Sequence, residues 1–143
     1  MSRPSSLRTD EETPAATSRP VDYSLGKMLS AFRYAFYGLG YLFRTQRNAQ
    51  IHALVGACAV ALGAFLGLAR WEWLVLVLTI TLVLAADGVN TAVEAAVDVA
   101  TSTYHPLARI AKDVAAGTVL ICAIASVLVG CIIFIPHLWD LLM

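Results

Sequence analysis

Three long apolar runs constrain the fold of this chain more than any other feature. Residues 51–69 contain His52 as the only strongly polar side chain, residues 73–86 are apolar, and residues 114–135 carry no charge. A bilayer core about 30 Å thick needs about 20 helical residues to cross it, and strand backbone left unpaired in lipid is too costly to span it. A soluble domain of 143 residues has too much surface to be 59% hydrophobic and only 14% charged. We therefore expect an all-α integral membrane protein with three transmembrane helices, at about 50–69, 73–98 and 112–135.

The segment before the first apolar run divides into two parts. Residues 1–22 are rich in Ser, Thr, Pro and charge, a composition that cannot bury enough apolar surface to fold and predicts a disordered tail. Residues 23–47 repeat apolar side chains at helical spacing, with basic residues and tyrosines between them. This pattern predicts an amphipathic helix in the membrane interface, in preference to a core helix of a soluble domain. Residues 23–143 are then one membrane domain.

The distribution of basic residues predicts the orientation in the membrane. Of the ten Lys and Arg residues, seven precede the first run, two lie between the second and third runs, and only Arg70 lies between the first and second. The positive-inside rule then predicts a multi-pass protein of the inner (cytoplasmic) membrane, with its N-terminus and the 98–113 loop in the cytoplasm. We expect residues 70–73 to form an outer turn, with Trp71, Trp73 and Trp139 in the outer aromatic belt. The net charge of zero gives no footprint for nucleic acid.

A polar stripe follows the second apolar run. Asp87, Asn90, Glu94 and Asp98 are spaced by three, four and four residues, so a helix stacks them on one side. Carboxylates so close together near a membrane are costly unless cations, or a cation-bound phosphate, neutralise them. The stripe therefore favours a metal–nucleotide site or a proton-transfer site, and the alternative is a solvated helix end.

Lys112 and Asp113 stand at the start of the third span. A Lys at this place can meet a phosphate, although a simple helix cap explains the pair as well. His105-Pro106 marks a break in the loop, and Pro106 suits the first position of a new helix. The chain has no P-loop and no Gly-rich dinucleotide fingerprint, so a nucleotide would need a different kind of site.

Two blocks of sequence resemble the prokaryotic diacylglycerol kinase family, which includes undecaprenol kinase. Residues 90–98 (NTAVEAAVD) and 104–113 (YHPLARIAKD) are similar to the family pattern Asn-Thr/Ser-Ala-Ile-Glu-x-x-x-Asp, followed by a short loop and Ala-Lys-Asp. The resemblance extends over roughly residues 25–136. It implies a homotrimeric lipid kinase that transfers the γ-phosphoryl group of ATP to the hydroxyl of a membrane lipid, with Mg²⁺, at cytoplasmic sites between subunits.

The resemblance also implies roles for individual residues. Asp87 stands at the position of the general base, Glu94 at a metal ligand, and Gln46 at the second metal-ligand position. The other positions that match the family's ATP site are Lys27, Tyr34, Asn90, Thr103, Tyr104, His105, Lys112 and Asp113. Residues 46–52 and 104–108 look more like the undecaprenol kinase branch than the diacylglycerol branch, and the expected substrate is undecaprenol or diacylglycerol.

Two positions depart from the family pattern. The base is usually Glu, and Asp87 is one methylene shorter; a misplacement of about 1 Å can cost about 100-fold in rate. The second metal position is also usually Glu, and Gln46 is a neutral and weaker ligand for a hard cation. These departures motivate an alternative, a weakened or inactive relative that binds lipid or nucleotide without turnover. A small transporter or proton relay is a further alternative, although the acids of the stripe all lie at one interface.

Overall fold

The computed structural model describes residues 25–143, and this part of the chain folds into four helices without a strand. The helices are α1 (Leu25–Thr45), α2 (Arg47–Leu66), α3 (Arg70–Ala100) and α4 (Pro106–Leu142). Helices α2, α3 and α4 are each long and apolar enough to cross a membrane, which confirms the all-α fold with three spans. The predicted tail at residues 1–22 lies outside the described residues.

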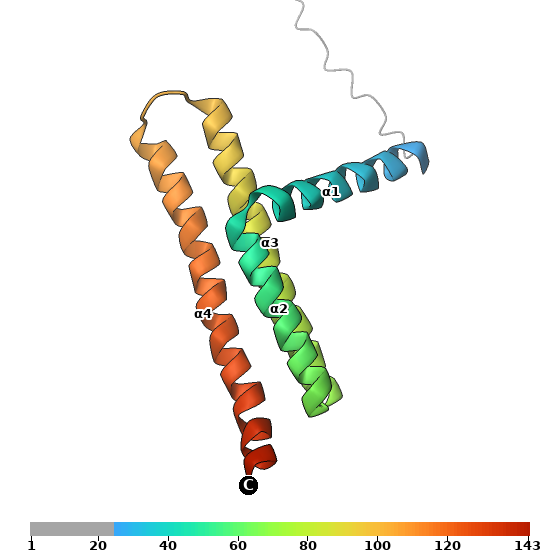
Figure 1. Cartoon of the computed structure of the whole chain (residues 1–143). Helices are drawn as coiled ribbons and strands as arrows, with labels where there is room; N and C mark the ends of the chain where they lie inside the picture. Colours follow the sequence, from blue (N-terminus) through green and yellow to red (C-terminus); the bar gives the residue numbers. More distant parts are fainter. Residues whose placement is uncertain (1–24) are drawn as a thin grey trace, which may run out of the picture.

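Helices α2, α3 and α4 run side by side with alternating direction, and α1 projects sideways from the start of α2 (Figure 1). The loop between α3 and α4 extends beyond the start of α2, and the C-terminus lies at the opposite end of the bundle. The 31 residues of α3 and 37 of α4 rise about 1.5 Å each, so both helices are longer than a bilayer core of about 30 Å. Their polar ends therefore have room to stand outside the hydrocarbon.

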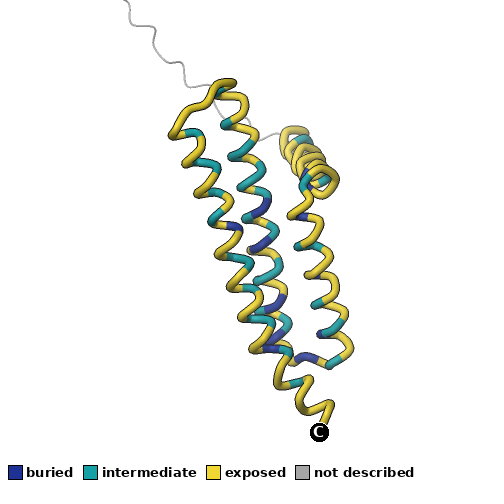
Figure 2. The backbone as a smooth tube through the Cα atoms, turned by 60° about the vertical axis from the view of Figure 1, so that its left-hand side comes forward, coloured by how far each residue is buried: buried dark blue, intermediate teal, exposed yellow. Residues whose placement is uncertain are grey.

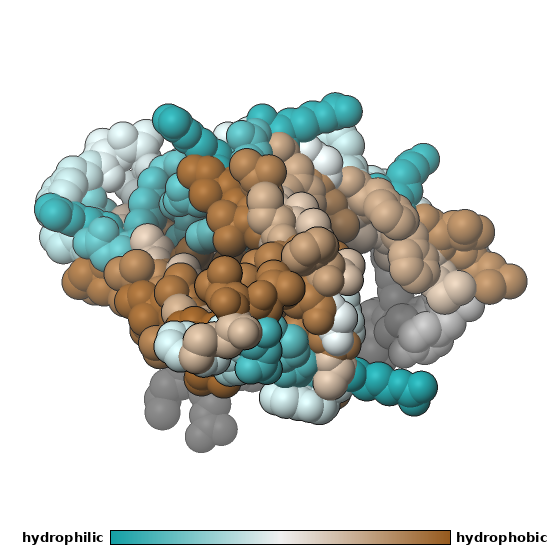
Figure 3. Space-filling view, turned by 60° about the horizontal axis from the view of Figure 1, so that its bottom comes forward, coloured by the Kyte–Doolittle hydropathy of each residue, from teal (hydrophilic) through white to brown (hydrophobic). Residues whose placement is uncertain are grey.

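The interior of the bundle is small. Leu68, Leu76 and Ile133 form its buried core, and Trp73 and Phe134 pack against it. Few of the described positions are buried, among them four on α3, three on α2 and two on α4, and α2 and α4 are exposed over most of their length (Figure 2). The exposed surface is itself apolar: in Figure 3 hydrophobic side chains fill most of the middle of the view, and hydrophilic ones gather toward its edges. An apolar exterior is what helices that meet lipid require.

Glycines bring α2 close to α3. A Cβ added at Gly56 would lie 3.0 Å from Ile80 Cγ2 of α3, and one added at Gly63 would lie 3.4 Å from the Trp73 ring of α3 and 2.8 Å from Leu68 Cδ1 of the turn. Small residues allow such approach because van der Waals packing, rather than the hydrophobic effect, holds helices together in lipid. The small-residue face of the first span therefore serves as a helix–helix contact.

The connection between α2 and α3 differs from the expected turn at residues 70–73. Gly67 ends α2 in the left-handed conformation, with φ of 72°, and its N–H donates to Gly63 O at 3.0 Å. The Glu72 carboxylate accepts a hydrogen bond from Ala69 N–H at 2.7 Å, which satisfies an open donor at the start of α3. The turn is consequently residues 67–69, and residues 70–73 are already helical.

The tryptophans at this end are arranged differently from one another. Trp71 and Trp139 are exposed, whereas Trp73 is half-buried against the core around Leu68. Trp71 and Trp139 are thus free to meet the membrane surface, as expected of an aromatic belt. Trp73 was expected to join them and instead packs inside the bundle, because the helix already begins at Arg70 and turns this side chain inward.

Helix α4 begins at Pro106, as the sequence indicated, and His105 caps it. The His105 Nδ1 atom accepts a hydrogen bond from Leu107 N–H at 3.3 Å, and Pro106 occupies the first turn, where its missing N–H costs nothing. The helix continues through Pro136 to Leu142, beyond the apolar run that ends at residue 135.

Candidate active site

The polar stripe of α3 exists as a helical row, but its members have different partners. Asn90 Nδ2 donates a hydrogen bond to Glu94 Oε1 at 2.9 Å. Asp87, one turn earlier, pairs with a side chain of α2, and Asp98, one turn later, pairs with α4. The stripe therefore serves two separate cavities rather than one continuous acidic surface.

Asn90 and Glu94 line the first cavity together with Asn48 and His52 of α2. The cavity has a volume of about 310 Å³ and is closed on its α4 side by small and apolar residues. The Asn90 Oδ1 atom is buried and has no hydrogen-bond partner among residues 25–143. A buried acceptor without a partner is costly, and here it stands next to a carboxylate. Amide and carboxylate oxygens are the ligands of hard divalent cations, so this pair fits a magnesium ion.

One chain supplies only part of such a metal site. Among the described residues, no group of three or more His, Cys, Asp or Glu side chains is arranged to hold a metal ion. Mg²⁺ is usually held by one or two carboxylates together with water and phosphate oxygens. The Asn90–Glu94 pair fits that pattern, in which protein side chains do not surround the ion completely.

Asp87 is almost fully buried, with 4% of its surface exposed. Its Oδ2 atom lies 2.6 Å from His52 Nδ1, across the interface between α2 and α3. Its backbone carbonyl accepts a hydrogen bond from the Thr91 hydroxyl at 2.9 Å. The side chain predicted to act as a base is thus held firmly by an imidazole that the sequence analysis did not assign to the site.

The loop between α3 and α4 forms a second cavity, of about 410 Å³. Lys112 Nζ donates to Asp98 Oδ1 at 2.5 Å, and Arg109 Nε lies 3.6 Å from Asp113 Oδ2. The cavity brings together five predicted residues with two further charged ones: Thr103, Tyr104, His105, Lys112 and Asp113, with Asp98 and Arg109. Both cations of this cavity are paired with carboxylates, so the cavity offers phosphate contacts only where Lys112 or Arg109 leaves its partner for a phosphate oxygen.

Besides Asp87, three predicted residues line neither cavity within the described chain. Lys27 and Tyr34 belong to α1, which leads away from the bundle (Figure 1). Tyr34 is exposed, and its ring lies 5.4 Å from the Arg33 guanidinium carbon. Gln46 is the single residue between α1 and α2, and its side chain makes no capping hydrogen bond. None of these three lines either cavity.

Six polar cavity residues were not among the predicted site residues, although Asp98 belonged to the predicted stripe: Asn48, His52, Asp98, Thr101, Ser102 and Arg109. Asn48 and His52 are four residues apart, so they share one side of α2, and His52 is the only strongly polar residue in its apolar run. That spacing was a usable signal, because polar side chains inside a membrane span usually face a functional interior.

Comparison with known proteins identifies the family. The family model for prokaryotic diacylglycerol kinase matches residues 33–134, which include both cavities. The chain belongs to the prokaryotic diacylglycerol kinase family. It is therefore a member of a family of membrane lipid kinases, and the polar ends of α3 and α4 are its candidate active site.

Individual relatives agree with this assignment. The chain is 44% identical over 116 residues to the diacylglycerol kinase of Synechocystis sp., covering 80% of this chain and 66% of the relative, slightly under two thirds of its length. It is 41% identical over 115 residues to the undecaprenol kinase of Bacillus subtilis, covering 80% of this chain and 93% of the relative. With the diacylglycerol kinase of Escherichia coli strain K12 it shares 28% identity over 111 residues, 78% of this chain and 91% of that one.

Proposed function

We propose that this protein transfers the γ-phosphoryl group of ATP to the hydroxyl of a membrane lipid alcohol, at the cytoplasmic surface of the inner membrane. The observation that carries the proposal is the Asn90–Glu94 pair at the polar end of a span. The Glu94 carboxylate is hydrogen-bonded to the Asn90 amide, whose buried oxygen has no partner in the described part of the chain. Within a family of lipid kinases, such a pair is best explained as a site for a cation bound to phosphate.

Phosphoryl transfer requires positioning and charge neutralisation more than covalent chemistry by the protein. Glu94 Oε2 and Asn90 Oδ1 would hold Mg²⁺. Gln46 does not line this cavity and would have to move toward it to serve as a neutral further ligand. The ion would neutralise the charge on the phosphate oxygens. The protein needs few acidic ligands for the ion because the phosphate oxygens of ATP would supply the others.

The second cavity is the proposed place for the remainder of the nucleotide. Lys112 is paired with Asp98, whose side chain is 66% exposed, and an exposed ion pair of this kind contributes about 0–1 kcal/mol. Lys112 can therefore turn from Asp98 to a phosphate at little cost. Asp113 and the three loop residues Thr103, Tyr104 and His105 would contact the nucleoside. Asp87 would act as the general base that takes the proton of the lipid hydroxyl.

We propose a homotrimer in which α1 of one subunit completes the site of another. Lys27 and Tyr34 lie on a helix that leads away from the cavities of their own chain (Figure 1). A neighbouring subunit could present the same residues to these cavities, with α1 lying in the cytoplasmic interface. Symmetric assembly of this kind is the usual form of homo-oligomers.

The lipid is undecaprenol or diacylglycerol, the two alcohols that the names of the relatives indicate. The test is transfer of radiolabelled γ-phosphate from ATP into the lipid phase of mixed micelles with Mg²⁺ and one lipid at a time. Wild-type protein is compared with Glu94→Gln, and with Glu72→Gln as a matched carboxylate change at the other end of α3. Label in at least one lipid, lost in Glu94→Gln but kept in Glu72→Gln, is the expected result.

No label in either lipid from folded protein would overturn the proposal. If MgATP or lipid still bound, the protein would instead be a relative that has lost turnover. The burial of Asp87 against His52 and the neutral side chain of Gln46 are the observations that favour that second reading.

A further inference from the structure

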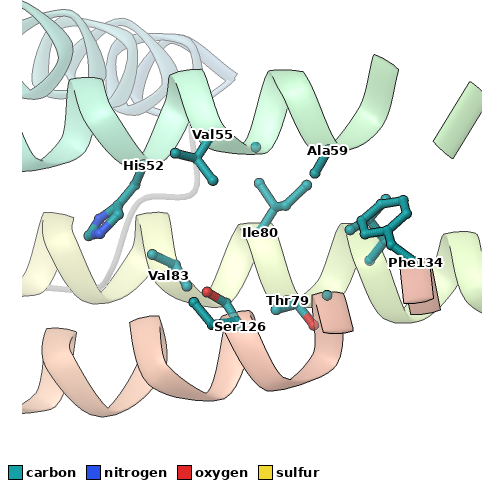
Figure 4. Close-up of a pocket in the computed structure, with 12 residues that line it drawn as sticks. His52, Val55, Ala59, Thr79, Ile80, Val83, Ser126 and Phe134 are labelled. Atoms are coloured by element: carbon teal, nitrogen blue, oxygen red, sulfur yellow. The ribbon is translucent and has the colours of Figure 1, made fainter. Parts of the chain in front are cut away.

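The His52–Asp87 pair lies between two cavities of different polarity. Residues of α2, α3 and α4 line an apolar cavity of about 240 Å³, with His52 at one end and Phe134 at the other (Figure 4). His52 also lines the first cavity, together with Asn90 and Glu94. A lipid alcohol has the same two parts, a hydrocarbon chain and a hydroxyl that must meet a phosphate, so its reacting hydroxyl belongs at the boundary between these cavities.

The spacing of side chains along α3 places Asp87 at this boundary. Val83 lines the apolar cavity and Asn90 lines the first cavity, with Asp87 between them at spacings of four and three residues. Such spacings put side chains on one side of a helix. On α2, His52 itself lines both cavities. The carboxylate proposed to take the lipid proton therefore stands between the place for a hydrocarbon and the place for a phosphate.

The contact between the two side chains joins α2 to α3. His52 Nδ1 lies 2.6 Å from Asp87 Oδ2, and Figure 4 shows the His52 ring reaching from α2 toward α3. An ionised carboxylate only accepts hydrogen bonds, so Nδ1 carries a proton and donates it to Oδ2. Asp87 is 4% exposed, and a hydrogen bond from a neighbouring helix to a packed side chain locks its conformation. The bond thereby fixes the direction in which Asp87 Oδ1 faces.

We propose that His52 is the positioning residue that holds the general base Asp87 in place for the lipid hydroxyl. The proposal rests on the proposed lipid kinase function, in which Asp87 takes the proton. Asp87 is one methylene shorter than the glutamate usual at this position, and a misplacement of about 1 Å can lower the rate about 100-fold. His52 compensates for the shorter side chain because it holds Oδ2 and directs Oδ1 toward the hydroxyl.

The step balances without any further reactant. Asp87 Oδ1 accepts the proton of the lipid O–H while the oxygen forms a bond to the γ-phosphorus. The bond from that phosphorus to the β–γ bridging oxygen breaks, and its electron pair leaves with ADP. The Asp87 carboxylic acid returns its proton to water when the products leave, and His52 keeps its own proton throughout.

The test separates the hydrogen bond from the shape of the ring. His52→Phe keeps a ring of similar size but has no donor, whereas the side-chain amide of His52→Asn can donate to Asp87 from nearly the position of Nδ1. We expect His52→Phe to lower kcat for lipid phosphorylation by about 10–100-fold, as for a misplaced catalytic group, with KM for ATP changed less than about threefold. His52→Asn should keep a kcat close to that of wild type. A purely structural role for His52 predicts a normal kcat for every variant that folds.

The matched control is the histidine–carboxylate pair at the opposite end of the bundle. His137 Nδ1 donates to Ile133 O at 2.9 Å, and its Nε2 lies 3.4 Å from Glu72 Oε2. His137→Phe makes the same chemical change far from both polar cavities and is expected to keep wild-type kcat. Thermal unfolding and MgATP binding of each variant establish that it is folded, and His52→Leu serves in place of His52→Phe if the latter is not.

A double substitution tests whether His52 acts through Asp87. His52→Phe combined with Asp87→Asn should be no slower than Asp87→Asn alone, since residues that act as one unit are strongly non-additive. Three results would overturn the inference and leave the proposed function standing: a folded His52→Phe with the kcat of wild type, a His52→Asn as slow as His52→Phe, or a further loss of rate in the double variant. Wild-type protein without lipid-dependent transfer would overturn both.

Discussion

At the scale of single residues, Asn90 is the most informative side chain. Its amide nitrogen donates to Glu94, and its carbonyl oxygen is buried without a partner among residues 25–143. Leaving an acceptor unsatisfied costs about 1–3 kcal/mol, so a ligand that binds there regains this energy. The chemistry of Asn90 therefore predicts that it tunes the affinity of Glu94 for a cation.

Replacement of Asn90 tests this role. Asn90→Ala removes both the oxygen and the hydrogen bond that orients Glu94, and we expect the Mg²⁺ concentration for half-maximal lipid phosphorylation to rise about 10–100-fold. The control is Thr118→Ala on α4, whose hydroxyl only contacts its own helix at Val114 O. A Mg²⁺ dependence of Asn90→Ala equal to that of wild type would contradict the assignment.

Sequence spacing predicted some of these residues and missed others for a physical reason. Periodicity along one helix is fixed by 3.6 residues per turn, so Asp87, Asn90 and Glu94 could be placed on one side of α3. The pairing of His52 with Asp87 joins positions 35 residues apart and depends on the register between two helices. That register is set by packing, which spacing within one helix does not encode.

At the scale of elements, the glycines of α2 decide how closely it approaches α3. At Gly56 a Cβ would lie 3.0 Å from Ile80 Cγ2, whereas at Gly117 on α4 it would meet no atom within 4 Å. The sequence indicated close packing through its small residues but not which helix would be the partner. His52 lies four residues before Gly56 on α2. The Gly56 contact therefore also sets the distance between the His52 and Asp87 side chains.

A substitution at Gly56 should therefore be costly. Gly56→Val forces a branched side chain against Ile80, and we expect unfolding in detergent to become easier by about 1–3 kcal/mol, as for other overpacked contacts. Gly117→Val introduces the same side chain into open space and is expected to change the unfolding free energy by much less. Equal effects of the two substitutions would show that α2 and α3 do not pack through Gly56.

The presence of the helices was predictable because few backbone structures other than a helix can span a bilayer. The residues at which the helices begin and end were harder to predict. Pro106 fixed the start of α4 through its own backbone, but the first turn of α3 depends on the Glu72 carboxylate reaching Ala69 N–H. That local hydrogen bond moved the turn from residues 70–73 to residues 67–69. The sequence prediction placed Glu72 in the outer turn at residues 70–73 and gave its carboxylate no role at the start of a helix.

At the scale of the whole molecule, the single chain holds most of the proposed site but not all of it. Thr103, Lys112 and Asp113 line one cavity. Lys27 and Tyr34 remain on α1, away from the bundle. A resemblance in sequence assigns roles to residues but does not say which subunit supplies each residue. The sequence therefore could not distinguish the residues that line the cavity from those on α1.

Mixing of inactive variants tests whether subunits share a site. Glu94→Gln and Lys27→Ala are each expected to lack activity, and equal amounts reassembled from denatured subunits should regain about a quarter of wild-type activity if neighbouring chains of a symmetric oligomer each contribute one residue. Mixing without denaturation provides the control. Reassembled mixtures as inactive as their components would mean that the site is not shared.

The most direct measurement of the central claim is the rate at which MgATP phosphorylates a lipid alcohol in the presence of wild-type protein and of Glu94→Gln. We predict lipid phosphate from the wild type with undecaprenol or diacylglycerol, and a rate lower by about 100-fold or more in the variant, because the ligand that positions charge at the phosphate is removed. Lipid phosphate formed equally fast by both proteins, or by neither when both are folded, would contradict the account.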